Sequence, residues 1–199
     1  IAMDMMLPAL PNIASAFHIT VANRPQMVLS IFLLGFGVGQ FIMGPLSDKF
    51  GRRPVLLVGL ALMVAASIGC SLAQTLPQLI AARFLQALGG ATGMVVSRAI
   101  IRDLYSRDRI SSMISLVIGV MMTAQMLSAL VGGLLETAFG WRAIFYFITV
   151  ASLSVAVLIA LALPETRRDR GASSSFRGDV GKLIRDRAFI GFVLCQVLA

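Results

Sequence analysis

Apolar and polar residues follow one another along the chain in long blocks. Four blocks contain no charged side chain; they cover residues 25–47, 54–82, 110–135 and 143–164 and are 22 to 29 residues long. A helix rises about 1.5 Å per residue and needs about 20 apolar residues to cross the hydrocarbon core of a bilayer. The pattern therefore predicts membrane-spanning helices.

The block over 54–82 is too long for one span, and a polar turn divides it. Gln74–Gln78 carries two glutamines, a threonine and a proline in the middle of the apolar run. We expect one helix on each side of this turn. The second helix, over 77–99, contains a single charge in its interior, Arg83.

The apolar runs at the two ends of the chain are shorter. Residues 1–17 are apolar apart from Asp4 and one asparagine, and residues 188–199 form an apolar run that stops with the sequence. We interpret them as part of a first helix and the start of a seventh. A signal peptide is the alternative for the first run, but Asp4, Pro8 and Pro11 argue against it.

The predicted fold class is all-α and transmembrane, a six-helix bundle followed by the start of a seventh helix. The bundle occupies residues 1–163, a charged and serine-rich linker occupies 164–187, and the seventh helix starts in 188–199. The six predicted helices cover residues 1–17, 25–45, 54–73, 77–99, 110–135 and 143–163.

Composition agrees with a lipid environment and excludes a soluble globular domain. The 199 residues are 58% hydrophobic and only 13% charged, whereas soluble domains carry about 25% charged residues. The net charge of +8 is concentrated in alternate connections: three basic residues in 49–53, four in 98–109 and seven in 167–187, against Arg24 and Arg142 on the other side. The positive-inside rule places the richer side in the cytoplasm. The basic charge is thus a topology signal, and no nucleic-acid partner is expected.

Polar residues inside the predicted spans are functional candidates, because a charge at the bilayer centre costs about 2.5–3.5 kcal/mol on insertion scales. Asp4 and Arg83 are such residues, and their depths would allow an ion pair or a water bridge. Gln86 and Gly90 follow Arg83 on the same helix face, which would face a cavity or a partner helix. The alternatives are a capping or packing role for Asp4 and a purely structural pair for Arg83.

A glycine-bounded charged segment connects the second and third predicted helices. Gly44 and Gly51 permit tight backbone geometry at the helix ends, and Asp48 lies among cations that include Arg52 and Arg53. An ordinary cytoplasmic turn would explain the arginines, but it would not explain the two glycines and the aspartate at this spacing.

Small residues repeat at helical spacing and predict close helix packing, since association in lipid depends on close approach. Cys70 and Cys195 both fall in apolar runs, so we interpret them as small core residues and not as a disulfide. The predicted packing residues are Gly35, Gly39, Gly89, Gly90, Gly132 and Gly133.

The sequence offers no chemistry typical of an enzyme. His18 is its one histidine, and there is no Cys/His cluster, nucleophile motif or nucleotide-binding P-loop. We expect no enzymatic activity, no metal site and no cofactor, so that an ion gradient would supply any energy.

Four segments resemble motifs of the major facilitator family. Residues 44–53 match G-x-L-x-D-x-x-G-R-R, and residues 83–91 are similar to the helix-four motif R-x-x-Q-G-x-G-A-A, with Ala87 at a position that prefers glycine. Residues 4–11, together with 98–103, resemble the bicyclomycin/chloramphenicol-resistance branch of drug:proton antiporters, with Met6 replacing a tyrosine. The helix-five antiporter motif keeps its small residues at 124–133 but lacks its proline.

This resemblance implies a secondary transporter that works by alternating access, with this chain as the amino-terminal bundle. It implies proton-coupled efflux of small drug-like molecules across the bacterial inner membrane, driven by the proton gradient. The partners would be the small-molecule substrate, the lipid bilayer and the carboxy-terminal half of the same transporter. Asp4, Arg83 and Gln86 would serve transport and proton coupling, and residues 44–53 would form a cytoplasmic latch.

Two alternatives remain open from the sequence. The protein could be an importer or uniporter of a small polar metabolite, which transport measured with and without a pH gradient would distinguish. It could also be a channel or a non-transporting membrane scaffold, which a saturable, gradient-driven flux would exclude.

Overall fold

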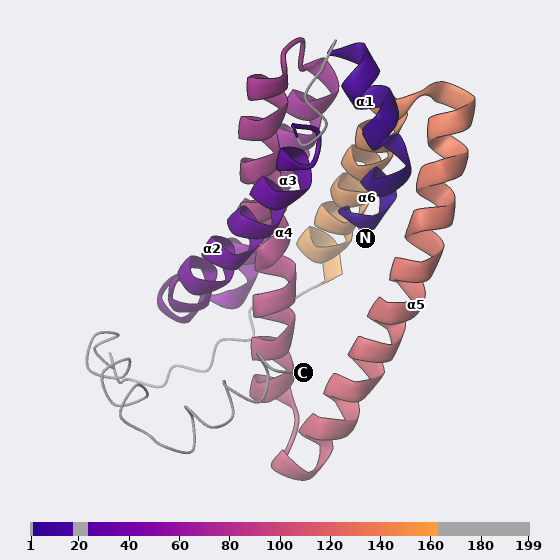
Figure 1. Ribbon diagram of the computed structural model, residues 1–199. Helices are drawn as coiled ribbons and strands as arrows, with labels where there is room; N and C mark the ends of the chain where they lie inside the picture. Colours follow the sequence, from indigo (N-terminus) through magenta and orange to yellow (C-terminus); the bar gives the residue numbers. More distant parts are fainter. Residues whose placement is uncertain (1, 18–23, 163–199) are drawn as a thin grey trace, which may run out of the picture. The chain divides into compact units, whose positions relative to one another are not determined.

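The computed structural model describes residues 2–17 and 24–162, and every regular element in these ranges is helical (Figure 1). Five of the helices are long and apolar enough to cross a membrane, and two shorter helical elements precede them. This confirms the predicted all-α transmembrane bundle. The elements are the 3₁₀ helix η1 (Asp4–Ala9) and the α-helices α1 (Leu10–Ala16), α2 (Met27–Phe50), α3 (Arg52–Leu72), α4 (Leu76–Leu104), α5 (Arg107–Phe139) and α6 (Trp141–Ala162).

The helices extend beyond the predicted spans, most clearly at the charged segment after α2. Residues 46–50, expected to belong to a turn, form the last part of α2. A charged residue ends the apolar span but not the helix, because a helix can continue into water. The break comes at Gly51, whose φ of 99° falls in a region that glycine adopts without strain.

The first predicted helix, over 1–17, is divided into η1 and α1. Pro8 lies inside η1, and Pro11 lies in the first turn of α1. Proline lacks an N–H group, so it fits the first turn of an α-helix but interrupts the regular hydrogen bonding of a helix interior. The two prolines therefore explain why one continuous α-helix does not form here.

The polar turn predicted at residues 74–78 is present and starts α4. The side chain of Gln78 accepts hydrogen bonds from the backbone N–H groups of Gln74 (3.0 Å) and Thr75 (3.3 Å). Thr75 is the N-cap residue of α4, and Pro77 lies in the first turn. This capping box satisfies N–H groups that have no partner within the helix.

Helix α4 lies at the centre of the bundle, between α2 and α3, and α3 also packs on α6. The contact between α2 and α4 depends on two predicted packing residues. A Cβ atom at Gly35 would come within 2.8 Å of the Phe84 carbonyl oxygen, and one at Gly39 within 2.7 Å of the Ala91 Cβ. Both glycines therefore permit an approach that a side chain would prevent.

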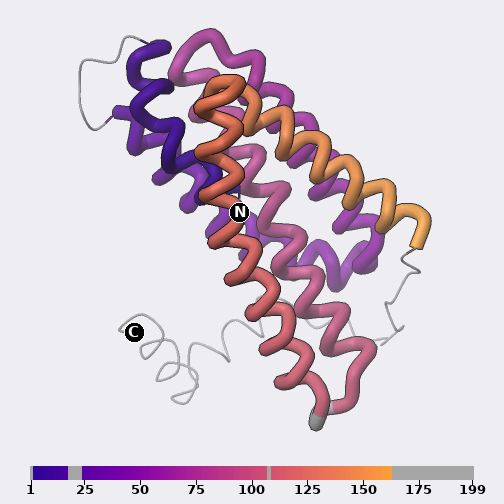
Figure 2. The backbone as a smooth tube through the Cα atoms, turned by 90° about the vertical axis from the view of Figure 1, so that its right-hand side faces the viewer, coloured from indigo at the N-terminus to yellow at the C-terminus, as the bar shows by residue number. Residues whose placement is uncertain are grey.

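Close backbone contact recurs between α3 and α4 and between η1 and α5. A Cβ atom at Gly89 would lie 2.5 Å from the carbonyl oxygen of Gly59, and one at Gly132 would collide with the backbone of Met5. Figure 2 shows η1 and α1 running beside α5. The other predicted packing glycines are less confined: Gly90 would place a Cβ 3.9 Å from the sulfur of Met63, and Gly133 would meet nothing within 4 Å among the described residues.

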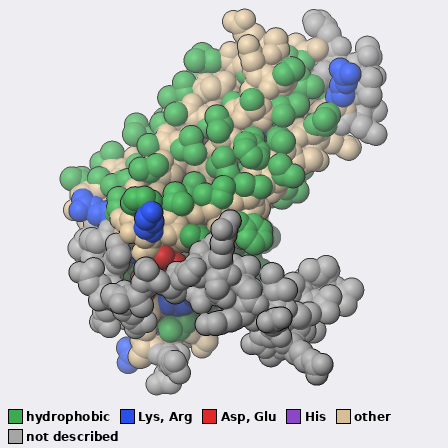
Figure 3. All heavy atoms as spheres, turned by 90° about the vertical axis from the view of Figure 1, so that its left-hand side faces the viewer, with side chains coloured by type: hydrophobic (Ala, Val, Ile, Leu, Met, Phe, Trp, Pro, Cys, Tyr) green, Lys and Arg blue, Asp and Glu red, His purple; other side chains and the backbone are tan. Residues whose placement is uncertain are grey.

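The described surface is largely apolar, as lipid contact requires. Figure 3 shows hydrophobic side chains over the middle of one face, with the visible basic side chains toward its ends. Exposed examples include Phe41 at 80% and Met126 at 80% of their full accessibility. The predicted linker at 164–187 and the helix start at 188–199 lie outside the described residues.

The glycine contacts give a testable prediction. In the full-length protein, Gly89→Ala should lower thermal stability in detergent, because overpacking costs about 1–3 kcal/mol and exceeds the gain of about 1 kcal/mol in helix propensity. Gly93→Ala is the matched control, since a Cβ there meets no described residue within 4 Å, and it should be neutral or stabilising. Equal melting temperatures for the two variants would contradict the packing of α3 on α4.

Candidate functional site

Arg83 lies in the first half of α4 and has no solvent-exposed surface. Two aromatic rings lie against its guanidinium: the Cζ atom is 5.1 Å from the ring centre of Phe32 on α2 and 5.2 Å from that of Phe145 on α6. Desolvated cation–π contacts of this kind contribute about 2 kcal/mol. The cation is thus held among aromatic side chains from two neighbouring helices.

A chain of hydrogen bonds connects Arg83 to α3. Its Nη1 donates to the Oε1 atom of Gln86 (2.7 Å), and the Nε2 atom of Gln86 donates to the hydroxyl of Ser67 (2.7 Å). The Ser67 hydroxyl in turn donates to the carbonyl of Met63 (2.7 Å). The structure therefore brings Arg83 and Gln86 together as their spacing predicts, and it adds Ser67, a buried hydroxyl that sequence reasoning missed.

Asp4 is the first residue of η1 and is partly buried. It lies two residues after Ala2, whose carbonyl oxygen is 3.4 Å from Nη1 of Arg83. Among the described residues, Arg83 donates to Ala2 and Gln86, and no ion pair joins it to Asp4. A role for Asp4 in carrying the proton therefore stays a prediction.

Arg52 joins three helix ends at the charged segment. Its Nε donates to the carboxylate of Asp103 (3.0 Å) at the end of α4, and its Nη1 donates to Asp48 (2.5 Å) and to the hydroxyl of Ser47 (2.8 Å), both in the last turns of α2. Asp103 is less exposed than Asp48, with side-chain accessibilities of 27% and 68%. Sequence reasoning noted Asp103 only as part of a family motif, because nothing in the sequence shows that α4 ends beside α3.

Two further arginines join α3 and α6 at opposite ends of the bundle. Arg53, at the start of α3, donates to the carbonyl of Ala160 near the end of α6 (2.6 Å). Arg142, at the start of α6, donates to the carbonyls of Ser71 (3.1 Å) and Ala73 (3.2 Å) at the end of α3. The last carbonyls of a helix lack partners within it and attract cations, so each helix stabilises the end of the other.

Gly44, the first glycine of the charged segment, lies inside α2 and not at its end. A Cβ atom there would be 3.9 Å from a methyl group of Val95, an ordinary contact. Of the two glycines in this segment, only Gly51 terminates a helix.

A buried carboxylate, Glu136, accepts a hydrogen bond from the side-chain amide of Asn12 and so joins α5 to α1. It is 9% exposed. Sequence reasoning missed it because the uncharged run ended at Leu135, although a charge directly beside such a run is a visible signal.

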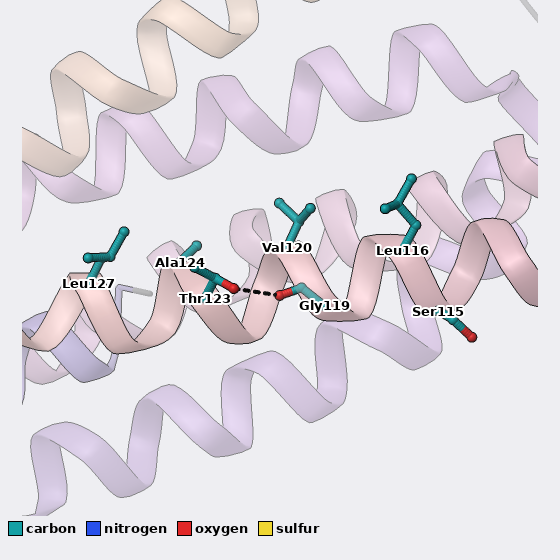
Figure 4. A pocket seen from close by; sticks show the side chains of 7 residues that line it. All are labelled: Ser115, Leu116, Gly119, Val120, Thr123, Ala124 and Leu127. Atoms are coloured by element: carbon teal, nitrogen blue, oxygen red, sulfur yellow. Dashed lines mark hydrogen bonds between the residues drawn. The ribbon is translucent and has the colours of Figure 1, made fainter.

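A shallow apolar groove lies along α5 (Figure 4). In this view Leu116, Val120 and Leu127 project from one side of the helix, whereas Ser115 points to the other. The Thr123 hydroxyl is turned back to the carbonyl of Gly119 (3.0 Å), which leaves the lining almost without free polar groups. The groove therefore suits an apolar partner better than a polar ligand.

Groups of three or more His, Cys, Asp and Glu side chains that could hold a metal ion are absent from the part of the chain that the structure describes.

Comparisons with known proteins agree with this arrangement. The sequence model of the Major Facilitator Superfamily matches residues 1–199. The chain is 37% identical over 173 residues to the chloramphenicol resistance protein of Pseudomonas aeruginosa, covering 86% of this chain and 41% of that protein. It is 36% identical over 166 residues to multidrug resistance protein D of Escherichia coli (strain K12), covering 83% and 42%.

A solved structure shares the fold. The crystal structure of the human organic anion transporter MFSD10 (TETRAN) has a TM-score of 0.63 and 26% sequence identity, and the match covers 88% of this chain and 48% of that one. The chain thus spans half or less of the length of these relatives. A family model that matches the whole chain, and a helical bundle with these motifs in place, establish that the chain belongs to the major facilitator superfamily.

Proposed function

We propose that the full-length protein exports small drug-like molecules in exchange for protons, and that this chain forms the amino-terminal bundle. The observation that carries the proposal is the environment of Arg83. This cation is fully buried in a membrane-spanning helix and is hydrogen-bonded to Gln86, which is in turn hydrogen-bonded to Ser67. A charge in such a position is costly and is characteristic of substrate and ion pathways. The names of the two bacterial relatives, which describe drug resistance, support export of drug-like compounds.

Arg83 does not itself carry the proton, because a guanidinium stays protonated at any accessible pH. A carboxylate must do so, and Asp4 on η1 is the leading candidate. The cation favours the ionised form of a carboxylate that approaches it. Movement of η1 relative to α4 would change the distance between the two groups. The carboxylate would bind a proton in the conformation that holds it far from Arg83, which would couple proton uptake to the conformational change.

The charged segment acts as a latch at the basic end of the bundle, which we place on the cytoplasmic side of the inner membrane by the positive-inside rule. Arg52 connects the ends of α2, α3 and α4 through Asp48 and Asp103. The ion pairs of Arg52 lie away from the buried hydrogen bonds of Arg83 and Gln86. They would therefore bias the conformational equilibrium without contacting the substrate.

The carboxy-terminal half of the transporter is the proposed partner of this bundle. The chain spans half or less of its relatives, and α5 presents an apolar face with few buried residues. A second bundle and lipid would together cover this surface. An importer, a uniporter or a scaffold would have the same fold, so transport measurements must distinguish them.

The first functional prediction tests coupling. In proteoliposomes with the full-length protein and radiolabelled chloramphenicol as the probe, flux should be saturable, and an imposed pH gradient should drive accumulation of the probe against its concentration gradient. Arg83→Ala should abolish the gradient-driven component while membrane insertion persists. Arg83→Lys should keep part of it with a changed pH profile, because lysine keeps the charge but loses the planar fork.

Each outcome assigns a role. Normal gradient-driven flux in Arg83→Ala would remove Arg83 from the mechanism, and loss of folded protein in that variant would indicate a structural role. Chloramphenicol flux that equilibrates without responding to the pH gradient would indicate a uniporter. No saturable flux with chloramphenicol and ethidium as probes would favour a scaffold.

The second functional prediction concerns the latch. Asp103→Asn should reduce the transport rate more than Asp48→Asn does, because Asp103 is better shielded from solvent and an exposed ion pair contributes only about 0.2–1 kcal/mol. Substrate affinity measured in detergent should change little in either variant. A large loss of affinity with an unchanged transport rate would contradict the latch.

A further inference from the structure

Two of the three guanidinium nitrogens of Arg83 have no hydrogen-bond partner among the residues that the structure describes. Nη1 donates to Gln86 and Ala2, whereas Nε and Nη2 are buried and make no hydrogen bond to any described residue. Buried polar groups are nearly always hydrogen-bonded, and the exceptions need an explanation. A buried charged donor without an acceptor is among the most costly of these exceptions.

The two unpaired nitrogens lie on the same edge of the guanidinium. Their N–H bonds are parallel, and their spacing matches the two oxygens of a carboxylate, which arginine binds through two parallel hydrogen bonds. The bond from Nη1 to Gln86, which is itself fixed by Ser67, restricts rotation of the guanidinium. The edge is therefore preorganised for a planar acceptor with two oxygens.

Arg142 provides an internal comparison, because it uses the same two atoms. Its Nε donates to the carbonyl of Ser71 and its Nη2 to the carbonyl of Ala73. In Arg142 the fold supplies both acceptors for this edge, and the arginine has a structural role. In Arg83 the fold supplies the aromatic neighbours and the Nη1 partner but leaves the same edge without an acceptor among the described residues.

We propose that the Nε–Nη2 edge of Arg83 is a subsite for the carboxylate of a transported substrate that has an apolar or aromatic body. Phe32 and Phe145, which flank the guanidinium, suit such a body. The carbonyl of Ala2 lies against Nη1, so the start of the chain covers the cation here and must move for a substrate to reach it. The inference rests on the proposed transport function and specifies a substrate class for it.

The test measures binding to the purified full-length protein in a neutral maltoside detergent at pH 7.5, without any gradient. The probes are biphenyl-4-carboxylate and biphenyl-4-carboxamide, which share shape and apolar surface and differ in charge and in the second oxygen. Isothermal titration calorimetry should give at least tenfold tighter binding for the carboxylate. Equal affinities, or no binding of either probe, would overturn the proposal without the need for a variant.

Variants assign the preference to this edge. Arg83→Gln should abolish it, and Arg83→Lys should retain part of it, since an ammonium is a point charge without the fork. Arg142→Gln is the matched control, which removes an arginine whose edge is already occupied and should leave the preference intact. A preference that survives Arg83→Gln overturns the proposal. If that variant does not fold, the Lys variant decides, because an unchanged preference there excludes bidentate binding.

Asp4→Asn distinguishes a substrate carboxylate from one supplied by the protein. Under the proposal the wild-type protein already prefers biphenyl-4-carboxylate, and Asp4→Asn keeps that preference. A preference that appears only in Asp4→Asn would show that Asp4 occupies the edge, and it would overturn the proposal.

The binding experiment and the flux experiment test the two proposals separately, because binding is measured without a gradient. Carboxylate binding without proton-driven flux would refute antiport alone. Proton-driven chloramphenicol flux without a carboxylate preference would refute the subsite alone.

Discussion

An arginine inside a membrane needs partners for its charge, and the centre of this bundle is arranged around that requirement. Arg83 draws on α2 and α6 for aromatic rings, on Gln86 for an acceptor and, through Gln86, on Ser67 of α3. Arg83, Gln86 and Ser67 are all fully buried, and α2 and α3 approach α4 closely at glycines in the same bundle. Close packing of the helix backbones supports burial of the charge, since a more loosely packed bundle would let lipid reach the cation.

Helices α3 and α6 are joined by hydrogen bonds from arginines to helix-terminal carbonyls. Arg53 and Arg142 bind the last carbonyls of α6 and α3 respectively, so these antiparallel helices are joined at both ends. Helix α5 is attached differently, through the contact of Gly132 with η1 and through the pair of Asn12 and Glu136. The bundle therefore combines firmly joined helices with α5, which is less buried.

The departures from the family motifs have a physical basis in the packing. Ala87, at a position where the helix-four motif prefers glycine, is fully buried, and its methyl group faces Gly35 of α2. The neighbouring helix therefore supplies the space that glycine would have left. In α5, Ala129 replaces the proline of the antiporter motif, and the helix continues unbroken from Arg107 to Phe139, while Gly132 still makes its close contact.

The sequence by itself determined the all-helical membrane architecture and the approximate limits of the five long helices, because an uncharged run of about 20 residues is the length that a membrane-spanning helix needs. It did not determine that the run over 1–17 divides into η1 and α1. It also determined that Arg83 and Gln86 share a face, since spacing within one helix is fixed by helix geometry. Only the tertiary structure decided that Asp103 pairs with Arg52, that Ser67 supports Gln86 and that Glu136 meets Asn12. Contacts between helices depend on the rotation of each helix about its own axis and on its position along the bundle. Close packing of small residues sets both quantities, and the sequence of one helix alone does not predict them.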